Sequence, residues 1–263
     1  MLILLSPAKS LDFASKPPKV ATTQPRLLAE SERLVEVMRT KSVADLAALA
    51  SISDELAALN ADRWTAFDTP FTRANARAAV LAFAGDVYQG MDVRGRFGTR
   101  DYTEAQKTVR ILSGLYGVLR PLDLIQAYRL EMGTRLATDR GRSLYDWWGS
   151  TITDVLREDL AASPGAQVVV NLASTEYFSA VRPDELGVPV ISPRFEDTDG
   201  RGRRSVISFF AKRARGELAA WLVLNRARTA AALKAFDGAG YRYDKAASTV
   251  GVPVFVRSFA DRR

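Results

Sequence analysis

The sequence predicts a mixed α/β fold in a single compact domain, with a mixed sheet surrounded by many helices. Short apolar segments typical of buried strands lie near both ends of the chain, and most segments with helical periodicity lie between them. No repeat, low-complexity tract or clean linker divides the 263 residues. One domain spanning residues 1–263 explains this arrangement better than two domains would.

Five segments are expected to form strands, because each is a short run rich in apolar residues. The first of them, Leu2–Leu5, is too short for a signal peptide and lacks basic residues before it. The predicted strands cover residues 2–5, 168–170, 188–191, 205–210 and 254–259.

Helical periodicity, with its start and stop signals, predicts eight helices. Ser53 and Asp54 are typical of a helix start, and Pro121 is expected to stop the helix before it. The segment from Gly85 to Gly90 is interpreted as a turn or a helix break. The predicted helices cover residues 27–39, 43–50, 53–60, 72–81, 103–119, 122–128, 144–162 and 211–227.

The chain contains no cysteine and no histidine. Structural zinc sites and iron–sulfur clusters use those side chains as ligands, so both are excluded in practice. Catalysis by Ser-His-Asp or Cys-His sets and thiol redox cycles are excluded for the same reason. We therefore expect no cofactor and no metal site. Any bound metal would be a hard cation held by carboxylate and carbonyl oxygens.

The formal net charge is +7 and the sequence pI is about 9.8. Residues 194–228 contain nine Arg or Lys and four Asp or Glu, a net charge of +5. This charge favours an anionic partner, although a solvated basic face is the alternative. No segment is long enough to span a membrane, so we expect a cytoplasmic protein that does not bind membranes. The sequence does not determine the oligomeric state, and we expect a monomer.

Two predicted strands end in polar residues. Ser6 and Lys9 follow the first strand, and Asn171, Ser174 and Glu176 follow the strand at residues 168–170. Ligands of α/β proteins commonly bind beyond the carboxyl ends of strands, so these side chains converge if the strands are neighbours. For Ser174, an N-cap of a short helix is the alternative.

The block from Leu112 to Gly133 has the outline of a helix-hairpin-helix, in which turn glycines let backbone N–H groups approach a phosphate. Gly114 and Gly117 are the candidate turn glycines, and Arg120 and Arg129 are candidate phosphate contacts. A corner with glycines at a close packing contact is the alternative. The arginines are also able to pair with neighbouring carboxylates.

The predicted helix at residues 211–227 is basic. Its apolar positions share one face, whereas Lys212, Arg215 and Gly216 fall on roughly the opposite face. Because glycine leaves bare backbone between cations, a phosphate is expected to approach there. An ordinary surface face with a packing glycine is the alternative.

Taken together, five blocks resemble the YaaA peroxide-stress-resistance family in order and spacing. The resemblance covers the chain from Met1 to about Phe259, and the tail at 246–263 departs most from the family pattern. The blocks are Leu4 to Lys9, Gly85 to Tyr88 with Asp86, Leu112 to Gly133, Asn171 to Ser174, and Ala211 to Gly216. The resemblance implies a bacterial cytoplasmic protein that supports survival under hydrogen peroxide and limits free iron. It also implies a compact α/β fold with a positively charged cleft, a helix-hairpin-helix-like element and DNA binding.

Three hypotheses about function follow. The first is DNA binding with little sequence specificity, through the phosphate contacts Lys9, Arg120, Arg129, Lys212, Arg213 and Arg215. The second is an enzyme acting on a nucleotide or nucleic acid in a polar pocket formed by Ser6, Lys9, Asp86, Tyr88, Asn171, Ser174 and Glu176. The third is iron sequestration, which has only carboxylates to use. Without Cys or His, protection against peroxide is expected to be indirect.

Overall fold

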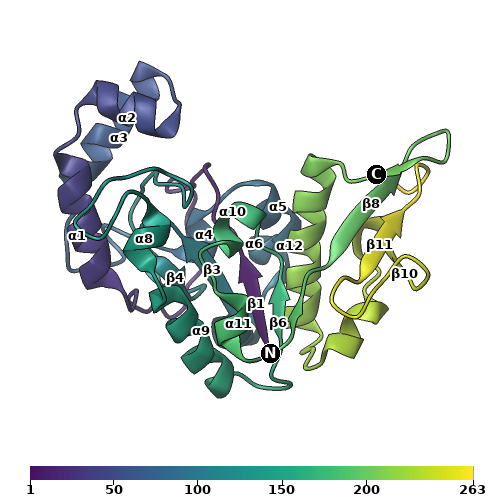
Figure 1. Cartoon of the computed structure of the whole chain (residues 1–263). Coiled ribbons are helices and arrows are strands. Elements are labelled where there is room, and N and C mark those ends of the chain that lie inside the picture. The colour runs from purple at the N-terminus through teal and green to yellow at the C-terminus, as the bar shows by residue number, and fades with distance from the viewer. Residues whose placement is uncertain (263) are drawn as a thin grey trace.

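A central five-stranded sheet carries the first strand of the chain in its middle (Figure 1). The computed structural model describes residues 1–262. The strand order is β4-β3-β1-β6-β7, and β1 (Leu2–Leu5) runs parallel to β3 (Val109–Ser113) and β6 (Val169–Asn171). All 4 residues of β1 are buried, which explains its uninterrupted apolar sequence. The sheet is mixed because β4 (Gly117–Leu119) pairs antiparallel with β3.

A second sheet of four strands, in the order β10-β11-β8-β9, forms the C-terminal part of the structure. Figure 1 shows the helix α12 (Ser208–Leu224) between the two sheets. A further pair, β2 with β5, forms a separate two-stranded sheet. The remaining strands are β2 (Arg77–Ala78), β5 (Leu124–Ile125), β7 (Val190–Ile191), β8 (Arg194–Thr198), β9 (Arg204–Ser205), β10 (Arg242–Asp244) and β11 (Val254–Arg257).

Most helices precede β6 in the sequence and surround the central sheet. At the upper left of Figure 1, α2 and α3 form a hairpin that projects from the rest of the molecule. The helices other than α12 are α1 (Leu28–Arg39), α2 (Val43–Ala50), α3 (Asp54–Ala66), α4 (Ala79–Ala82), α5 (Asp86–Met91), α6 (Val93–Arg96), α7 (Thr99–Thr108), α8 (Leu144–Trp148), α9 (Thr151–Ala162), α10 (Thr175–Phe178), α11 (Pro183–Leu186) and the 3-10 helices η1 (Ala230–Ala235) and η2 (Gly238–Gly240).

The predicted mixed α/β class is confirmed, with strands near both ends of the chain and most helices between them. The helix predicted at residues 43–50 has the observed bounds of α2, because Ser42 and Asp45 form a capping box at its start. Within residues 1–262, no helix is long and apolar enough to span a membrane.

The predicted helix-hairpin-helix is wrong. α7 ends at Thr108, and the chain then forms β3, a turn, β4 and β5, so residues 112–133 contain no helix. Every residue of β3 is buried, and β3 lies beside β1 in the sheet. A continuous apolar run satisfies the helical period and a doubly buried strand equally well, so the sequence pattern did not distinguish them.

Several other element predictions are also corrected. The helix predicted at residues 72–81 is a turn followed by β2 and α4, and the strand predicted at 205–210 includes the start of α12. The segment interpreted as a turn around Asp86 is the helix α5. The helix predicted at 144–162 is two helices, because Gly149 has a φ of 50° and ends α8.

Candidate functional site

A pocket of about 490 Å³ lies at the C-terminal ends of β1 and β6. The loop after β1, the start of α5, residues 128–131 and the segment after β6 supply most of its wall. Lys212 and Arg215 of α12 complete the lining. The pocket therefore lies where parallel strands of an α/β sheet end, which is the common place for ligands in such folds.

The two strand ends meet because β1 and β6 are parallel neighbours. The Oγ of Ser6 accepts a hydrogen bond from the backbone N–H of Ser174 at 2.8 Å, and the two hydroxyl oxygens lie 3.3 Å apart. Ser174 occupies the N-cap position of α10, but its side chain makes no capping hydrogen bond. Asn171 lines a neighbouring surface pocket instead, where its amide nitrogen lies 3.4 Å from Ser192 Oγ.

One carboxylate in the pocket serves two cations. The Oε2 of Glu131 lies 2.9 Å from Lys9 Nζ, and its Oε1 lies 3.3 Å from a terminal nitrogen of Arg129. The Nε of Arg129 is buried and has no hydrogen-bond partner within residues 1–262. The group of three thus keeps a surplus positive charge and an unused donor.

Within the described part of the chain, the cations of α12 have no carboxylate partner. Glu217 is the acidic residue of this helix, and it already pairs with Arg96 at 2.7 Å. Among the described residues, neither Lys212 nor Arg215 forms an ion pair, although Arg215 is half-buried. Burial lowers the pKa of Arg215 from its ordinary value, because the charged guanidinium loses water.

Polar groups of other kinds line the same pocket. Tyr88 donates a hydrogen bond from its hydroxyl to the carbonyl of Ser6 at 2.9 Å. Burial raises the pKa of Tyr88 well above its ordinary value, so the phenol stays protonated and keeps this bond. The Oε1 of Glu176 accepts the backbone N–H of Gly133 at 2.9 Å. Asp86 lies at the start of α5.

The predicted phosphate approach to Gly216 is wrong, because α5 occupies that space. A Cβ on Gly216 would lie 1.8 Å from the carbonyl oxygen of Val87. The same holds on the other helix, where a Cβ on Gly90 of α5 would lie 2.1 Å from the carbonyl oxygen of Arg213 in α12. Both glycines allow α5 and α12 to pack backbone against backbone, as the packing alternative predicted.

Gly114 and Gly117 also have packing roles, and both are buried. A Cβ on Gly114 would lie 2.3 Å from the carbonyl oxygen of Leu130. Gly117 has a φ of 65° and would direct a Cβ to within 2.9 Å of Trp148. Neither backbone is open to a phosphate, so their predicted role as phosphate-binding glycines is wrong.

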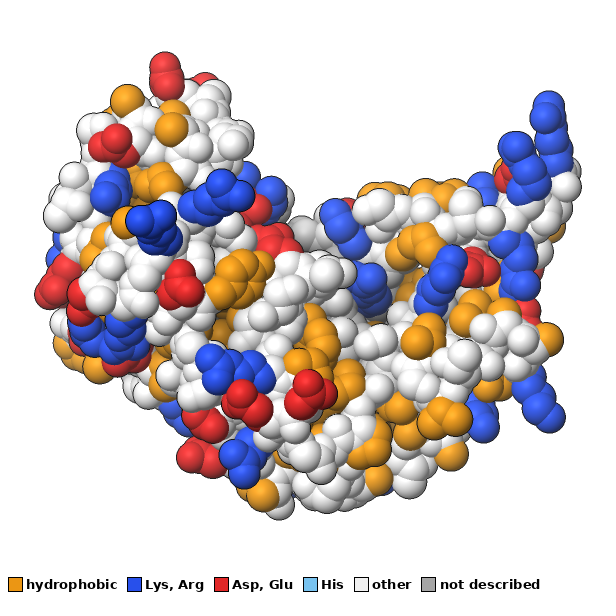
Figure 2. Space-filling view, in the orientation of Figure 1, with side chains coloured by type: hydrophobic (Ala, Val, Ile, Leu, Met, Phe, Trp, Pro, Cys, Tyr) orange, Lys and Arg blue, Asp and Glu red, His pale blue; other side chains and the backbone are white. Residues whose placement is uncertain are grey.

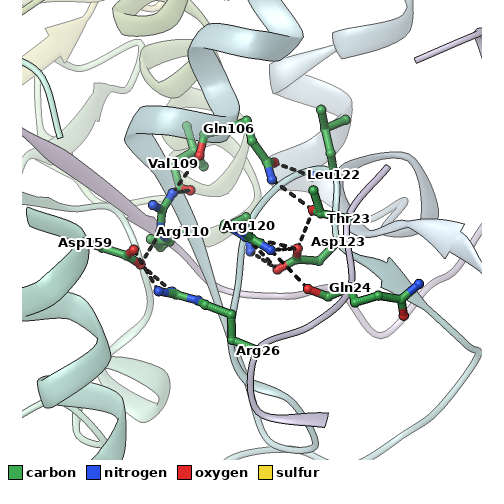
Figure 3. A network of polar contacts seen from close by, with 10 residues as sticks. All are labelled: Thr23, Gln24, Arg26, Gln106, Val109, Arg110, Arg120, Leu122, Asp123 and Asp159. Atoms are coloured by element: carbon green, nitrogen blue, oxygen red, sulfur yellow. Dashed lines mark hydrogen bonds and ion pairs between the residues drawn. The ribbon is translucent and has the colours of Figure 1, made fainter. Parts of the chain in front are cut away.

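Arg120 lies outside the pocket, in a network of polar contacts that Figure 3 shows. Its guanidinium pairs with Asp123 at 2.9 Å and donates to the carbonyl of Gln24 at 3.0 Å. The Asp123 side chain is 0% exposed, and its carboxylate also accepts the backbone N–H of Arg120 at 2.7 Å. The predicted DNA contact at Arg120 is therefore replaced by a structural pair.

A second part of Figure 3 was not foreseen from the sequence. Asp159 accepts hydrogen bonds from both Arg26, at 2.9 Å, and Arg110. The Arg110 side chain is only 5% exposed, so this is a buried ion cluster. The partners lie far apart in the sequence, and no local pattern connects them.

Figure 2 shows this face of the molecule hollowed between two lobes, with Lys and Arg side chains on both sides of the hollow. The α2–α3 hairpin lies on one side and the C-terminal sheet on the other (Figure 1). Lys41 and Arg135 line a shallower surface pocket on the α2 side. On the other side, exposed Arg213 lies outside the main pocket, with its guanidinium 5.9 Å from the centre of the Phe209 ring.

The pocket combines four cations, Lys9, Arg129, Lys212 and Arg215, with the carboxylates of Asp86, Glu131 and Glu176. Such a set has the chemistry to hold an oxyanion through the cations and to accept hydrogen bonds from other groups through the carboxylates. Within residues 1–262, no three acidic side chains gather in the manner of a metal site.

A family model described as peroxide stress protein YaaA matches residues 1–247 of the chain. Relatives described as UPF0246 proteins are 52% identical over 258 residues in Burkholderia orbicola and 50% identical over 257 residues in Alcanivorax borkumensis. Both alignments cover 98% of this chain and 98% of the relative. Another UPF0246 protein, from Shewanella halifaxensis, is 49% identical over 257 residues, which cover 98% of this chain and 99% of the relative.

Proposed function

The chain belongs to the YaaA family of peroxide stress proteins, and we propose that it binds DNA with little sequence preference in the hollow above the pocket. Its place is in the oxidative stress response of a bacterial cell, and we propose that it acts in the cytoplasm. Binding would shield DNA from damage or limit iron-driven damage near it. The chain contains no cysteine, so it has no thiol that could reduce peroxide directly.

The observation that carries the proposal is the unpaired charge on α12. Lys212 and Arg213 are exposed, follow one another in sequence and have no carboxylate partner within the described residues. Most other arginines on the molecule's surface pair with an acidic side chain, as Arg203 pairs with Asp199 at 2.8 Å. Unpaired cations beside a hollow are the groups that neutralise DNA phosphates and release their counterions.

The position of these cations also supports the proposal. Exposed Lys9 lines the same pocket as Lys212 of α12, and Lys41 lines a surface pocket beside α2. Contacts of this kind reach phosphate oxygens and carry no sequence information. The expected binding is therefore tolerant of sequence and sensitive to salt.

The test compares Lys212→Ala/Arg213→Ala with the parent chain by fluorescence anisotropy on duplexes of unrelated sequence. Each lost phosphate contact reduces the slope of log K against log salt by about 0.9, so the double variant should lose up to about two units of slope. Affinity should fall equally for every duplex. A matched control is Arg157→Ala/Arg182→Ala, which removes one cation from α9 and one from the N-cap position of α11, away from the pocket.

The control should bind DNA nearly as the parent does, apart from the small effect of lower net charge. DNA affinity that does not change with salt, or that is equal in both double variants, would refute the proposal.

An enzyme acting on a nucleotide or nucleic acid is the second candidate. Asp86, Glu131 and Glu176 favour it, because carboxylates among cations are not needed to hold a DNA backbone. Incubating the protein with nucleotides and DNA oligomers, followed by mass spectrometry, tests this candidate. A product that disappears in Glu131→Gln would support it, and unchanged substrates under all conditions would count against it.

A further inference from the structure

We infer that the pocket at the ends of β1 and β6 is a site for a small phosphate monoester that also carries N–H donors, such as a nucleoside monophosphate. The phosphate would contact Arg215 and Arg129, and the donors would contact the carboxylate of Glu176. The inference deepens the proposed function, since it assigns a ligand of its own to the pocket beneath the DNA-binding hollow.

The first support is a pair of guanidinium groups with unused donors. Arg215 is half-buried, yet it forms no hydrogen bond or ion pair with any described residue. Arg129 has only a long contact of 3.3 Å from one terminal nitrogen to Glu131, and the residue lines the same pocket as Arg215. Partly buried charged donors without acceptors are costly in a folded protein, so an oxyanion that accepts their hydrogen bonds removes that cost.

The second support is that the side chains are arginines. The planar guanidinium matches two oxygens of a phosphate at once, which a lysine ammonium does not. Lys9 and Lys212 lie at the same pocket and are more exposed than Arg215. They add positive charge at the mouth, which suits the double negative charge of a monoester better than the single charge of a diester.

The third support is the acceptor side of the pocket. Glu176 uses its Oε1 for the N–H of Gly133 and has no ion-pair partner within residues 1–262. Its second oxygen is thus available for a donor of the ligand. A simple phosphate ion would leave this acceptor unused, whereas a base or amine on the ester would satisfy it.

The fourth support is size and rigidity. A volume of about 490 Å³ lies within the range of small-molecule pockets, and a duplex cannot enter it. The walls formed by α5 and α12 are fixed by the contact of Gly216 with the backbone of Val87. Tyr88 is fixed as well by its hydrogen bond to Ser6. The pocket is therefore formed before the ligand arrives.

The test is isothermal titration calorimetry of the full chain with AMP, GMP, CMP and UMP, with the matching nucleosides and with inorganic phosphate. At least one monophosphate should bind, and its nucleoside should bind at least 100-fold more weakly. Arg215→Gln should lower the affinity at least tenfold. Arg213→Gln, on the same helix but outside the pocket, should leave it unchanged.

Glu176→Gln tests the proposed contact with the N–H donors of the ligand separately from the proposed phosphate contacts. Glutamine retains the oxygen that accepts the Gly133 N–H, so the fold is expected to persist. This variant should weaken the monophosphates and leave the affinity for inorganic phosphate unchanged. If Arg215→Gln fails to fold, Lys212→Gln provides the same test at an exposed position, with a smaller expected loss of affinity.

Failure of this inference is distinguishable from failure of the proposed function. No heat of binding with any monophosphate at about 10 mM overturns the inference, as does equal affinity in Arg215→Gln and the parent chain. Either result leaves the DNA titrations of Lys212→Ala/Arg213→Ala standing. Conversely, loss of DNA binding with retained monophosphate binding would support the small-ligand site alone.

Discussion

Two sets of arginines in this molecule have the same chemistry and opposite surroundings. In the network of Figure 3, Arg110 and Arg26 share the carboxylate of Asp159, and Arg120 pairs with buried Asp123. On α12, the cations have no such partner within the described residues. Net charge therefore says little about binding, because many of the described cations pair with the protein's own acids, as Arg110 does. Only a cation without such a partner is available to a ligand.

The largest expected effect comes from breaking the buried cluster. Asp159→Asn leaves buried Arg110 without a negative partner and also removes the partner of the more exposed Arg26, which should lower the free energy of unfolding by roughly 3–5 kcal/mol. Urea denaturation measures this loss. Lys212→Ala is the matched contrast, and it should change stability by no more than about 0.5 kcal/mol because Lys212 is exposed. Equal stabilities of the two variants would show that the comparison is wrong.

A smaller effect is expected at Arg120. Arg120→Ala removes the main ion partner of Asp123, whose side chain is 0% exposed, and should cost about 1–3 kcal/mol of stability. Asp123 keeps its hydrogen bonds from Thr23 and the backbone, which limits the loss. DNA affinity of the folded variant should be unchanged. A loss of DNA affinity as large as that of Lys212→Ala/Arg213→Ala would contradict this expectation and show that Arg120 contributes to DNA binding.

The smallest expected effect is on the loss of stability at acidic pH, which depends on the pKa of Asp159. Burial alone raises the pKa of Asp159, but hydrogen bonds from Arg110 and Arg26 outweigh it, so the pKa lies below its ordinary value. A depressed carboxyl pKa stabilises the fold above the unfolded value of about 3.9, and this stabilisation is lost as pH falls through the folded value. Thermal unfolding between pH 6 and 2.5 should therefore show a shallower acid decline for Asp159→Asn than for the parent chain. Parallel curves would contradict the assigned cause.

The sequence predicted the fold class and the place of the pocket better than the details of its walls. The convergence of Ser6 and Ser174 was predicted from a simple rule, since both follow apolar strands that are parallel neighbours in the sheet. The local pairing of Arg120 with Asp123 was an open alternative, because the two are three residues apart. In contrast, Arg110 and Asp159 are 49 residues apart, and only the tertiary fold brings them together.

The roles of the glycines were the hardest to predict from the sequence. A glycine within a helix is consistent both with an open backbone that a phosphate approaches and with a close contact to another helix. Local sequence does not separate the two, because the deciding atom belongs to a distant segment. At Gly216 that atom is the carbonyl oxygen of Val87. The helix predicted over β3 was wrong for a similar reason. A strand buried on both faces has no alternation of apolar and polar residues, so its sequence does not differ from that of a buried helix.

The backbone contact between α5 and α12 has a consequence for protein engineering. With Gly90 and Gly216 facing one another's helix, the spacing between the walls that carry Tyr88 and Arg215 is set by main-chain atoms. Side chains adapt to a new neighbour by changing rotamer, but a main chain does not. A designer who wants the pocket to accept a bulkier molecule therefore has to trim a lining side chain such as Leu130, since any residue larger than glycine at position 216 forces the helices apart.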